Sequence, residues 1–263
     1  MRKGREESMK ISTVLSLIIT VLICGILYFR MIKREVPEHI GWIQALVPVA
    51  LGMATMEISG FIGVKLFFAN AALMTSVSQM PALMGSIVSA FMVAGMPEEV
   101  IKFIAIILFA GIFKPRIKNV YEYILLGAAI GFGFTIMEET AYSGDVNGIE
   151  MVYMLLRKIS VPAHMALNML MGEFIGIAKY RKALNKGSSV SCYFIALFVP
   201  MLIHTLYDAF TALNRLVVNP DSFVSGIILV LIGFIGFPVW IIYMLIRYKK
   251  KTGEFCSMSL LQE

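Results

Sequence analysis

The chain has 263 residues, of which 59% are hydrophobic and only 15% are charged, and its formal net charge is +6. Soluble domains carry roughly a quarter of charged residues, so this composition excludes an ordinary soluble domain and indicates a polytopic membrane protein. The net charge does not indicate a nucleic-acid partner, because the basic residues cluster beside apolar segments, as they do in cytoplasmic loops.

Long apolar segments predict the membrane-spanning helices, since each is close to the roughly 20 residues that cross a bilayer. The clearest segments are 11–29, 40–57, 97–113, 123–141, 160–178, 190–211 and 224–246. The stretch 58–96 is apolar but interrupted by Lys65, Asn70 and Pro81. It predicts a further span, an extension of the next helix or an interfacial segment. We therefore expect an all-α membrane bundle of seven to eight transmembrane helices.

Basic residues predict the orientation of the bundle in the lipid bilayer. Lysines and arginines fill the loops 114–122 and 179–189 and the tail after residue 246. The positive-inside rule assigns these segments, and hence the C-terminus, to the cytoplasm. The loops 142–159 and 212–223 carry fewer basic residues and are expected outside. Both flanks of the first helix are basic, so the orientation of the N-terminal half stays open.

Polar residues interrupt the apolar segments at four places. Ionisable side chains in lipid cost several kcal/mol unless they face a protein interior or a wet cavity. The predicted topology places all four groups at one depth, in the outer part of the membrane. We therefore expect one buried acid/base or metal site, built from Glu98-Glu99 with Lys102, Glu138-Glu139, His164 with Asn168, and His204 with Asp208.

The first of these groups allows two interpretations. Pro97 precedes Glu98 and Glu99, and proline followed by carboxylates is typical of the first turn of a helix, where the helix dipole stabilises negative charge. Alternatively, one glutamate is the general base that activates water. Lys102 lies one helical turn away and can pair with either carboxylate.

The second group lies on a helix face that is built for close packing. Small residues and one carboxylate recur there at helical spacing, as Gly127, Gly131, Thr135 and Glu138. Small residues let another helix approach closely, so Glu138 is expected to face the protein interior. Phe134 lies one turn before it. Glu139 points elsewhere and is expected to end the span.

The third and fourth groups each contain a histidine. One helix face carries His164, Asn168 and two glycines at four-residue spacing. His204 and Asp208 are also four residues apart, and a carboxylate one turn from a histidine can fix its tautomer. Each histidine is either a structural hydrogen-bonding residue or a metal ligand, and spacing alone does not choose between the two.

Taken together, these residue types suit hydrolysis by two routes. In the first, His164, His204 and Glu138 hold a divalent metal such as zinc with an open position, and a further glutamate acts as the base. In the second, no metal is used, a glutamate activates water and the histidines stabilise an oxyanion.

The ordered motifs resemble the PrsW family of bacterial intramembrane proteases, within the CAAX-protease and bacteriocin-processing superfamily. The resemblance covers roughly residues 95–212. It rests on the segments PEEVIKF (97–103), GFGFTIMEETAY (131–142), VPAHMALNMLMGEFIGIAKY (161–180) and LIHTLYDAF (202–210).

This resemblance implies roles for individual residues. The implied catalytic residues are Glu98, Glu99, Glu138, His164 and His204. The implied supporting residues are Lys102, Phe134, Asn168 and Asp208. The chain departs from the family at Glu139, where the family often has asparagine. The family further implies a multi-pass protein of the bacterial plasma membrane. Its implied substrate is a single-pass regulatory protein, typically an anti-sigma factor of a stress response, cut near the outer face.

We expect one structural domain with three parts. Residues 1–96 would supply N-terminal transmembrane helices, residues 97–211 a four-helix catalytic core, and residues 212–263 the last helix with a basic cytoplasmic tail. Two alternatives stay open. An ion-coupled transporter predicts repeated halves with broken helices, and no such symmetry is visible. A non-catalytic membrane scaffold of the same superfamily predicts the loss of motif residues, whereas all of them are present.

Overall fold

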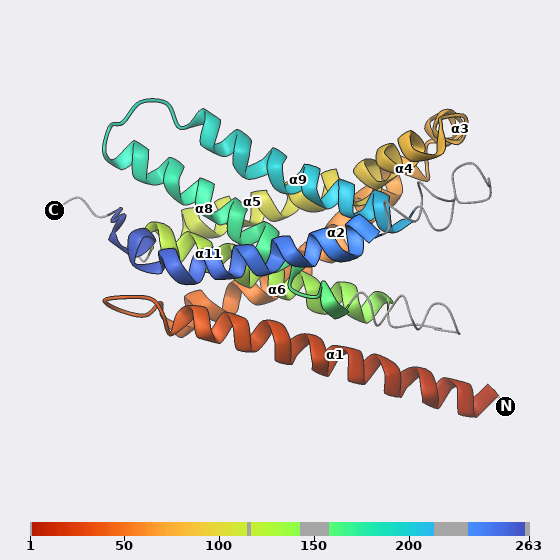
Figure 1. Ribbon diagram of the computed structural model, residues 1–263, viewed down its shortest axis with the longest axis horizontal. Coiled ribbons are helices and arrows are strands. Elements are labelled where there is room, and N and C mark those ends of the chain that lie inside the picture. Colours follow the sequence, from red (N-terminus) through yellow and green to blue (C-terminus); the bar gives the residue numbers. More distant parts are fainter. Residues whose placement is uncertain (1, 115–116, 143–157, 213–230, 261–263) are drawn as a thin grey trace.

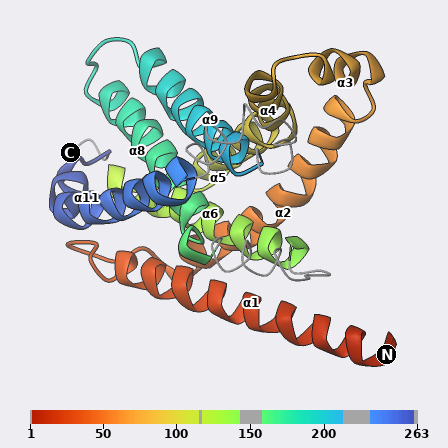
Figure 2. The ribbon, with the colours of Figure 1, turned by 45° about the vertical axis from the view of Figure 1, so that its right-hand side comes forward.

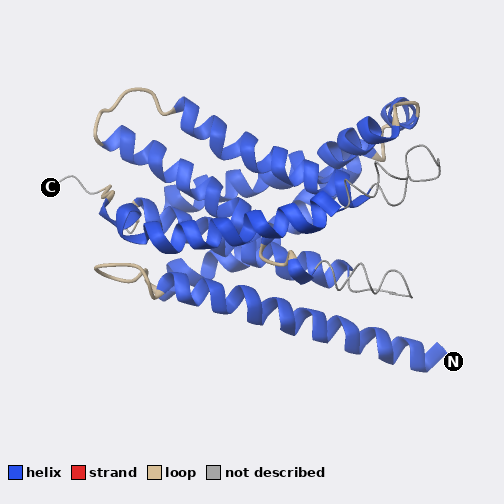
Figure 3. Cartoon of the chain, viewed as in Figure 1, coloured by secondary structure: helices blue, strands red, loops and turns tan. Residues whose placement is uncertain are grey.

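The computed structural model describes residues 2–114, 117–142, 158–212 and 231–260, and over these ranges the chain is a bundle of helices (Figure 1). In Figure 3 every regular element of the described part is a helix. This confirms the predicted all-α membrane bundle. The longer elements are α1 (Arg2–Ile32), α2 (Trp42–Phe67), α5 (Met96–Ile112), α6 (Val120–Tyr142), α8 (Ala163–Ala183), α9 (Val190–Ala212) and α11 (Phe237–Ser257).

Four of the described helices are long and apolar enough to cross a membrane. The qualifying stretches are Val14–Ile32, Trp42–Phe67, Val120–Ala141 and Val190–Phe210. The total of seven to eight spans therefore stays a prediction. Part of the last predicted span, residues 224–230, lies outside the described residues, and its remainder is helical from the π-helical turn η4 (Ile232–Gly236) into α11.

The stretch 58–96 resolves into three parts. Helix α2 continues through its first residues, and the short helix α3 (Ala71–Ser78) follows. Helix α4 (Ala82–Ala90) then runs through a π-helical turn, η1 (Phe91–Gly95), directly into α5. The expected extension of the next helix is thus what the chain adopts over residues 82–96.

This continuity changes the position of Glu98 and Glu99. Gly95, just before α5, has helical backbone angles, with φ −53° and ψ −49°. Pro97 and the two glutamates occupy the first turn of α5, as predicted. The turn continues η1 without a break and has no side-chain cap, so the glutamates lie inside a longer helical rod and not at a free helix end. Pro97 lacks an N–H group and would interrupt regular α-helical bonding. The wider π-helical turn immediately before it accommodates this loss.

Helix α6 is the central element of the bundle, and 89% of the residues in its most apolar window are buried. Its glycines let the neighbouring helices approach so closely that backbone atoms come into contact. A Cβ added at Gly131 would lie 2.3 Å from the carbonyl oxygen of His164 on α8, and one added at Gly133 would lie 1.9 Å from that of Val49 on α2. The predicted close-packing face of α6 is thus confirmed. Figure 2 shows α1 along one side of the bundle, with α9 and α4 on the opposite side.

One end of the bundle gathers the connections that follow α1, α5 and α8, together with the end of α11 (left in Figure 1). Lys118 forms an ion pair with Glu38 at 2.5 Å, and Val120 N–H donates to the carbonyl of Met258 at 3.2 Å. Residues 33–41 therefore lie beside the basic loop before α6 and beside the chain after α11. This relation settles which end of the N-terminal helices faces the basic loops, which the sequence left open.

Candidate active site

The carboxylates and lysine of α5 form a buried ion-pair cluster. Lys102 Nζ lies 2.8 Å from Glu99 Oε1 and 3.2 Å from Glu98 Oε2. The side chains of Lys102 and Glu99 are wholly buried, whereas that of Glu98 is 15% exposed. The pairing predicted from one-turn spacing is therefore present with both glutamates, and one ammonium group serves two carboxylates.

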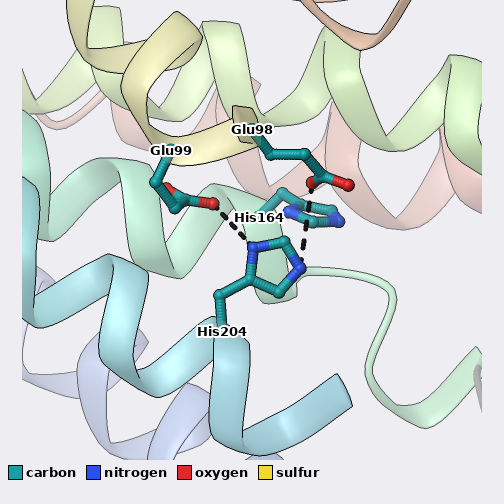
Figure 4. Close-up of side chains that lie close together, drawn as sticks. All are labelled: Glu98, Glu99, His164 and His204. Carbon is teal, nitrogen blue, oxygen red and sulfur yellow. Dashed lines mark hydrogen bonds and ion pairs between the residues drawn. The ribbon is translucent and has the colours of Figure 1, made fainter. Parts of the chain in front are cut away.

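His204 on α9 joins this cluster from the opposite side (Figure 4). Its Nδ1 atom lies 2.9 Å from Glu99 Oε1. Its Nε2 atom lies 3.3 Å from Asp208 Oδ2 and 3.8 Å from Glu98 Oε2. The imidazole is buried and faces three carboxylates, so the expected His204–Asp208 contact is one part of a larger network.

His164, near the start of α8, faces the same cluster from a third side. Its Nδ1 atom lies 3.2 Å from Lys102 Nζ, and its Nε2 atom lies 2.9 Å from Glu138 Oε2. A lysine ammonium group is a donor only, so Nδ1 accepts this bond. Nε2 then carries the hydrogen and donates it to Glu138. The inward-facing carboxylate predicted on α6 thus sets the tautomer of His164.

Phe134 closes the cluster on the α6 side. Lys102 Nζ lies 3.7 Å from the centroid of its ring, within the range of a cation–π contact. The same ring is 4.6 Å from that of His164, and the rings of His164 and His204 are 5.1 Å apart. Phe134 therefore covers the buried ammonium group with an apolar surface that still attracts positive charge.

Two other predicted residues lie apart from the cluster. Asn168 is wholly buried, and its side-chain amide donates to the carbonyl of His164 at 2.8 Å. This hydrogen bond ties the Asn168 side chain to the backbone of α8 at His164. Glu139 forms an ion pair with Lys158, whose Nζ also donates to Ser16 Oγ at 2.5 Å. No motif had indicated Lys158, because its partners are distant in the sequence.

The donor atoms at the centre suit a divalent metal. Glu98, Glu99, His164 and His204 each offer one ligand atom, and these four atoms lie within 4.8 Å of one another. Imidazole nitrogens and carboxylate oxygens are a zinc-type donor set. Glu99 Oε2 is buried without a hydrogen-bond partner among the described residues. Glu98 and Glu99 share one ammonium group, so a further cation would balance their charge. Lys102 Nζ lies 3.2 Å from His164 Nδ1, so it would have to withdraw before that nitrogen could bind a metal. Glu138 lies outside this set of four.

A small cavity adjoins the two histidines. Its volume is about 20 Å³, which is enough for one water molecule. Glu138, His164, His204 and Asp208 are among the side chains that line it. A water molecule can therefore lie beside the imidazoles and the carboxylates within the apolar bundle.

Fold and cluster define a helical membrane protein with a buried site of carboxylates, imidazoles and one lysine. The chain belongs to the PrsW family, described as the PrsW family of intramembrane metalloproteases, whose model matches residues 41–242.

Two relatives named Protease PrsW resemble the chain over about half of its length. The protein of Halalkalibacterium halodurans is 31% identical over 124 residues, which is 47% of this chain and 54% of the relative. The protein of Clostridioides difficile is 31% identical over 121 residues, which is 45% of this chain and 49% of the relative. The match thus spans about half the length of these curated relatives. No solved structure matches the chain.

Proposed function

We propose that this protein is an intramembrane endopeptidase that hydrolyses a peptide bond of a single-pass membrane protein. The observation that carries the proposal is the convergence of Glu98, Glu99, His164 and His204, whose donor atoms lie within 4.8 Å of one another inside an apolar bundle. Membership of a family described as intramembrane metalloproteases supports the same reaction. An ionisable cluster of this kind is costly in a membrane, and its presence there marks a functional site.

Glu98 is our candidate for the general base. Its side chain is 15% exposed, whereas that of Glu99 is wholly buried and is held by Lys102 and His204. Glu98 would accept a proton from water as the water oxygen attacks the scissile carbonyl carbon. It would then return that proton to the amide nitrogen as the carbon–nitrogen bond breaks.

Glu99, His164 and His204 are our candidates for holding a divalent metal. Such a metal, when bound, supplies Lewis-acid polarisation of a carbonyl and lowers the pKa of bound water. Glu138 and Asp208 contact the outer nitrogens of the two imidazoles and would orient them. In the metal-free alternative, the same imidazoles would face the oxyanion of the tetrahedral intermediate.

The arrangement of charges indicates on which side of the membrane the substrate would be cut. Glu138 lies near the end of α6, and His164 near the start of α8, so the cluster lies toward the end of the bundle opposite the basic loops. By the positive-inside rule this end faces outward and the C-terminus is cytoplasmic. We infer cleavage near the extracytoplasmic face. The PrsW family membership adds the bacterial plasma membrane as the location and an anti-sigma-factor-like protein as the substrate class.

The test is N-terminal peptide profiling of membranes from cells that express the wild type or Glu99→Gln. We expect new N-termini near the outer edge of a single-pass protein with the wild type alone. Purified protein assayed with and without a chelator then distinguishes the two routes. Identical profiles, with both proteins inserted in equal amounts, would contradict the proposed activity.

A further inference from the structure

A second cavity lies at the end of the bundle with the basic loops, since Arg34 just after α1 and Tyr121 at the start of α6 line it. Its volume is about 180 Å³. Helices α1, α6, α8 and α11 contribute its walls. None of the residues proposed for hydrolysis lines it. The cavity therefore calls for an occupant of its own.

Basic side chains surround one part of this cavity. Arg30, Arg34 and Lys249 are among its lining residues, which include no aspartate or glutamate. None of these three side chains forms an ion pair with another described residue. The polar groups of the two lining tyrosines are already engaged, since Tyr121 donates to the carbonyl of Met31 and Tyr248 donates to Glu173. The side chains of this cavity that are left to bind a ligand are thus the positively charged ones.

The remaining wall is apolar and opens to the outer surface of the bundle. It contains Leu27 on α1, together with Ile242 and Ile246 on α11. Ile242 is 56% exposed and Ile246 is 47% exposed, as is typical of side chains that face acyl chains in a bilayer. A small hydrophilic anion would make no use of this wall.

We propose that this cavity binds an anionic phospholipid. Its phosphate would contact Arg30, Arg34 and Lys249, and its acyl chains would lie along Leu27 and the exposed isoleucines of α11. Basic pockets between transmembrane helices recognise lipid headgroups in this way. The basic loops at the same end place the cavity at the depth of the headgroups that such a lipid presents.

The proposal is tested with purified full-length protein in neutral detergent. Native mass spectrometry would follow the binding of phosphatidylglycerol and, separately, of phosphatidylcholine. We expect phosphatidylglycerol to bind more tightly by about tenfold or more, from the attraction of several basic residues. The triple variant Arg30→Gln, Arg34→Gln, Lys249→Gln should lose this preference.

A matched control separates the cavity from net charge. Lys179→Gln, Lys182→Gln, Lys186→Gln removes three positive charges from the end of α8 and the loop that follows it, at the same end of the bundle. This variant should keep the preference. A second variant, Leu27→Trp, keeps every charge but fills the apolar wall, and it should weaken the binding of phosphatidylglycerol.

Two results would overturn the proposal. One is equal retention of phosphatidylglycerol by the wild type, the cavity triple variant and Leu27→Trp. The other is displacement of the lipid by millimolar inorganic phosphate, which would make the cavity a site for a free anion. The measurement does not depend on hydrolysis, so it stands apart from the proposed protease activity.

Discussion

His204 Nδ1 lies 2.9 Å from Glu99 Oε1, although 105 residues separate them in the sequence. Close helix packing makes this contact possible. A Cβ added at Gly95, just before α5, would lie 2.1 Å from Thr205 Oγ1 on α9. The absence of a side chain at Gly95 therefore lets α9 approach α5 at the level where the imidazole meets the carboxylate.

Removing either proposed carboxylate should stop the reaction while the protein stays folded, because Lys102 keeps the other carboxylate as its partner. We expect Glu98→Gln and Glu99→Gln to lower the rate of peptide hydrolysis by about a hundredfold or more, the range for loss of a general base or of a group that holds the site. The measurement is the cleavage rate of a reconstituted substrate. Glu57→Gln, on an exposed position of α2, is the control and should retain full activity. Normal cleavage by Glu98→Gln would reject its assignment as the base.

Replacing the buried lysine should destabilise the protein. Lys102→Met keeps most of the side-chain volume but leaves Glu98 and Glu99 without their shared cation. Loss of one partner of a buried ion pair costs about 3–5 kcal/mol, so the thermal transition in detergent should fall by several degrees. The exposed substitution Lys65→Met should leave it unchanged.

A double variant shows whether charge is the cause. Lys102→Met combined with Glu99→Gln should recover part of the lost stability, because one buried carboxylate is then neutral. If the double variant were no more stable than Lys102→Met, the loss would come from packing against Phe134 instead.

Close contact between α6 and α8 should not tolerate an added methyl group. A Cβ at Gly131 would lie 2.3 Å from the carbonyl oxygen of His164, and this atom is backbone and cannot rotate away. We expect Gly131→Ala to lower stability by about 1–3 kcal/mol, as overpacking does. A Cβ at Gly60 meets nothing within 4 Å. Gly60→Ala should therefore be neutral or stabilising, and equal effects of the two substitutions would contradict the role of the contact.

Glu35, in the turn after α1, should make stability depend on pH. Burial raises the pKa of its carboxyl, although the Ile40 N–H that donates to it at 2.5 Å acts in the opposite direction. A carboxyl whose pKa is higher in the folded state contributes stability that is present below the unfolded pKa, about 4.3, and is lost as the pH rises through the folded pKa. Glu35→Gln should therefore gain stability relative to the wild type as the pH rises.

The neighbouring Glu38 supplies a control of opposite sign. It is exposed, and the hydrogen bond and charge of Lys118 lower the pKa of its carboxyl. Its contribution to stability is present above the unfolded pKa and is lost as the pH falls. Glu38→Gln should thus show a weak effect in the reverse direction. Chemical unfolding in detergent across a pH series measures both, and parallel curves for Glu35→Gln and the wild type would contradict the effect of burial.

Much of the fold could be predicted because it follows from local patterns. Apolar length predicted the long helices, and small residues on one face of α6 predicted a close contact with another helix, which the structure shows to be α8. The π-helical turn before Pro97 could not be predicted in the same way. A wider turn has no characteristic composition, and its geometry follows from the packing of the whole rod.

In the candidate site, too, local contacts could be predicted from the sequence and contacts between helices could not. The contacts of Lys102 with Glu98 and Glu99 follow from the spacing of one helical turn. Those of Lys102 with His164, over 62 residues, and of Glu139 with Lys158 depend on how helices pack. Charge topology indicated a shared depth for the four groups, but it gave no information on which atoms would meet. The roles of these residues in catalysis stay predictions.

The position of Lys102 has a consequence for how the protein is made. Glu98 and Glu99 find their counter-ion on their own helix, one turn away, so this helix can enter the membrane with its charges already paired. His204 is translated 105 residues after Glu99 and joins it only when α9 has been inserted. A ribosome-bound intermediate that ends before α9 would thus hold a stable but incomplete cluster. On the proposed function, peptide hydrolysis would therefore become possible only once α9 has joined the cluster.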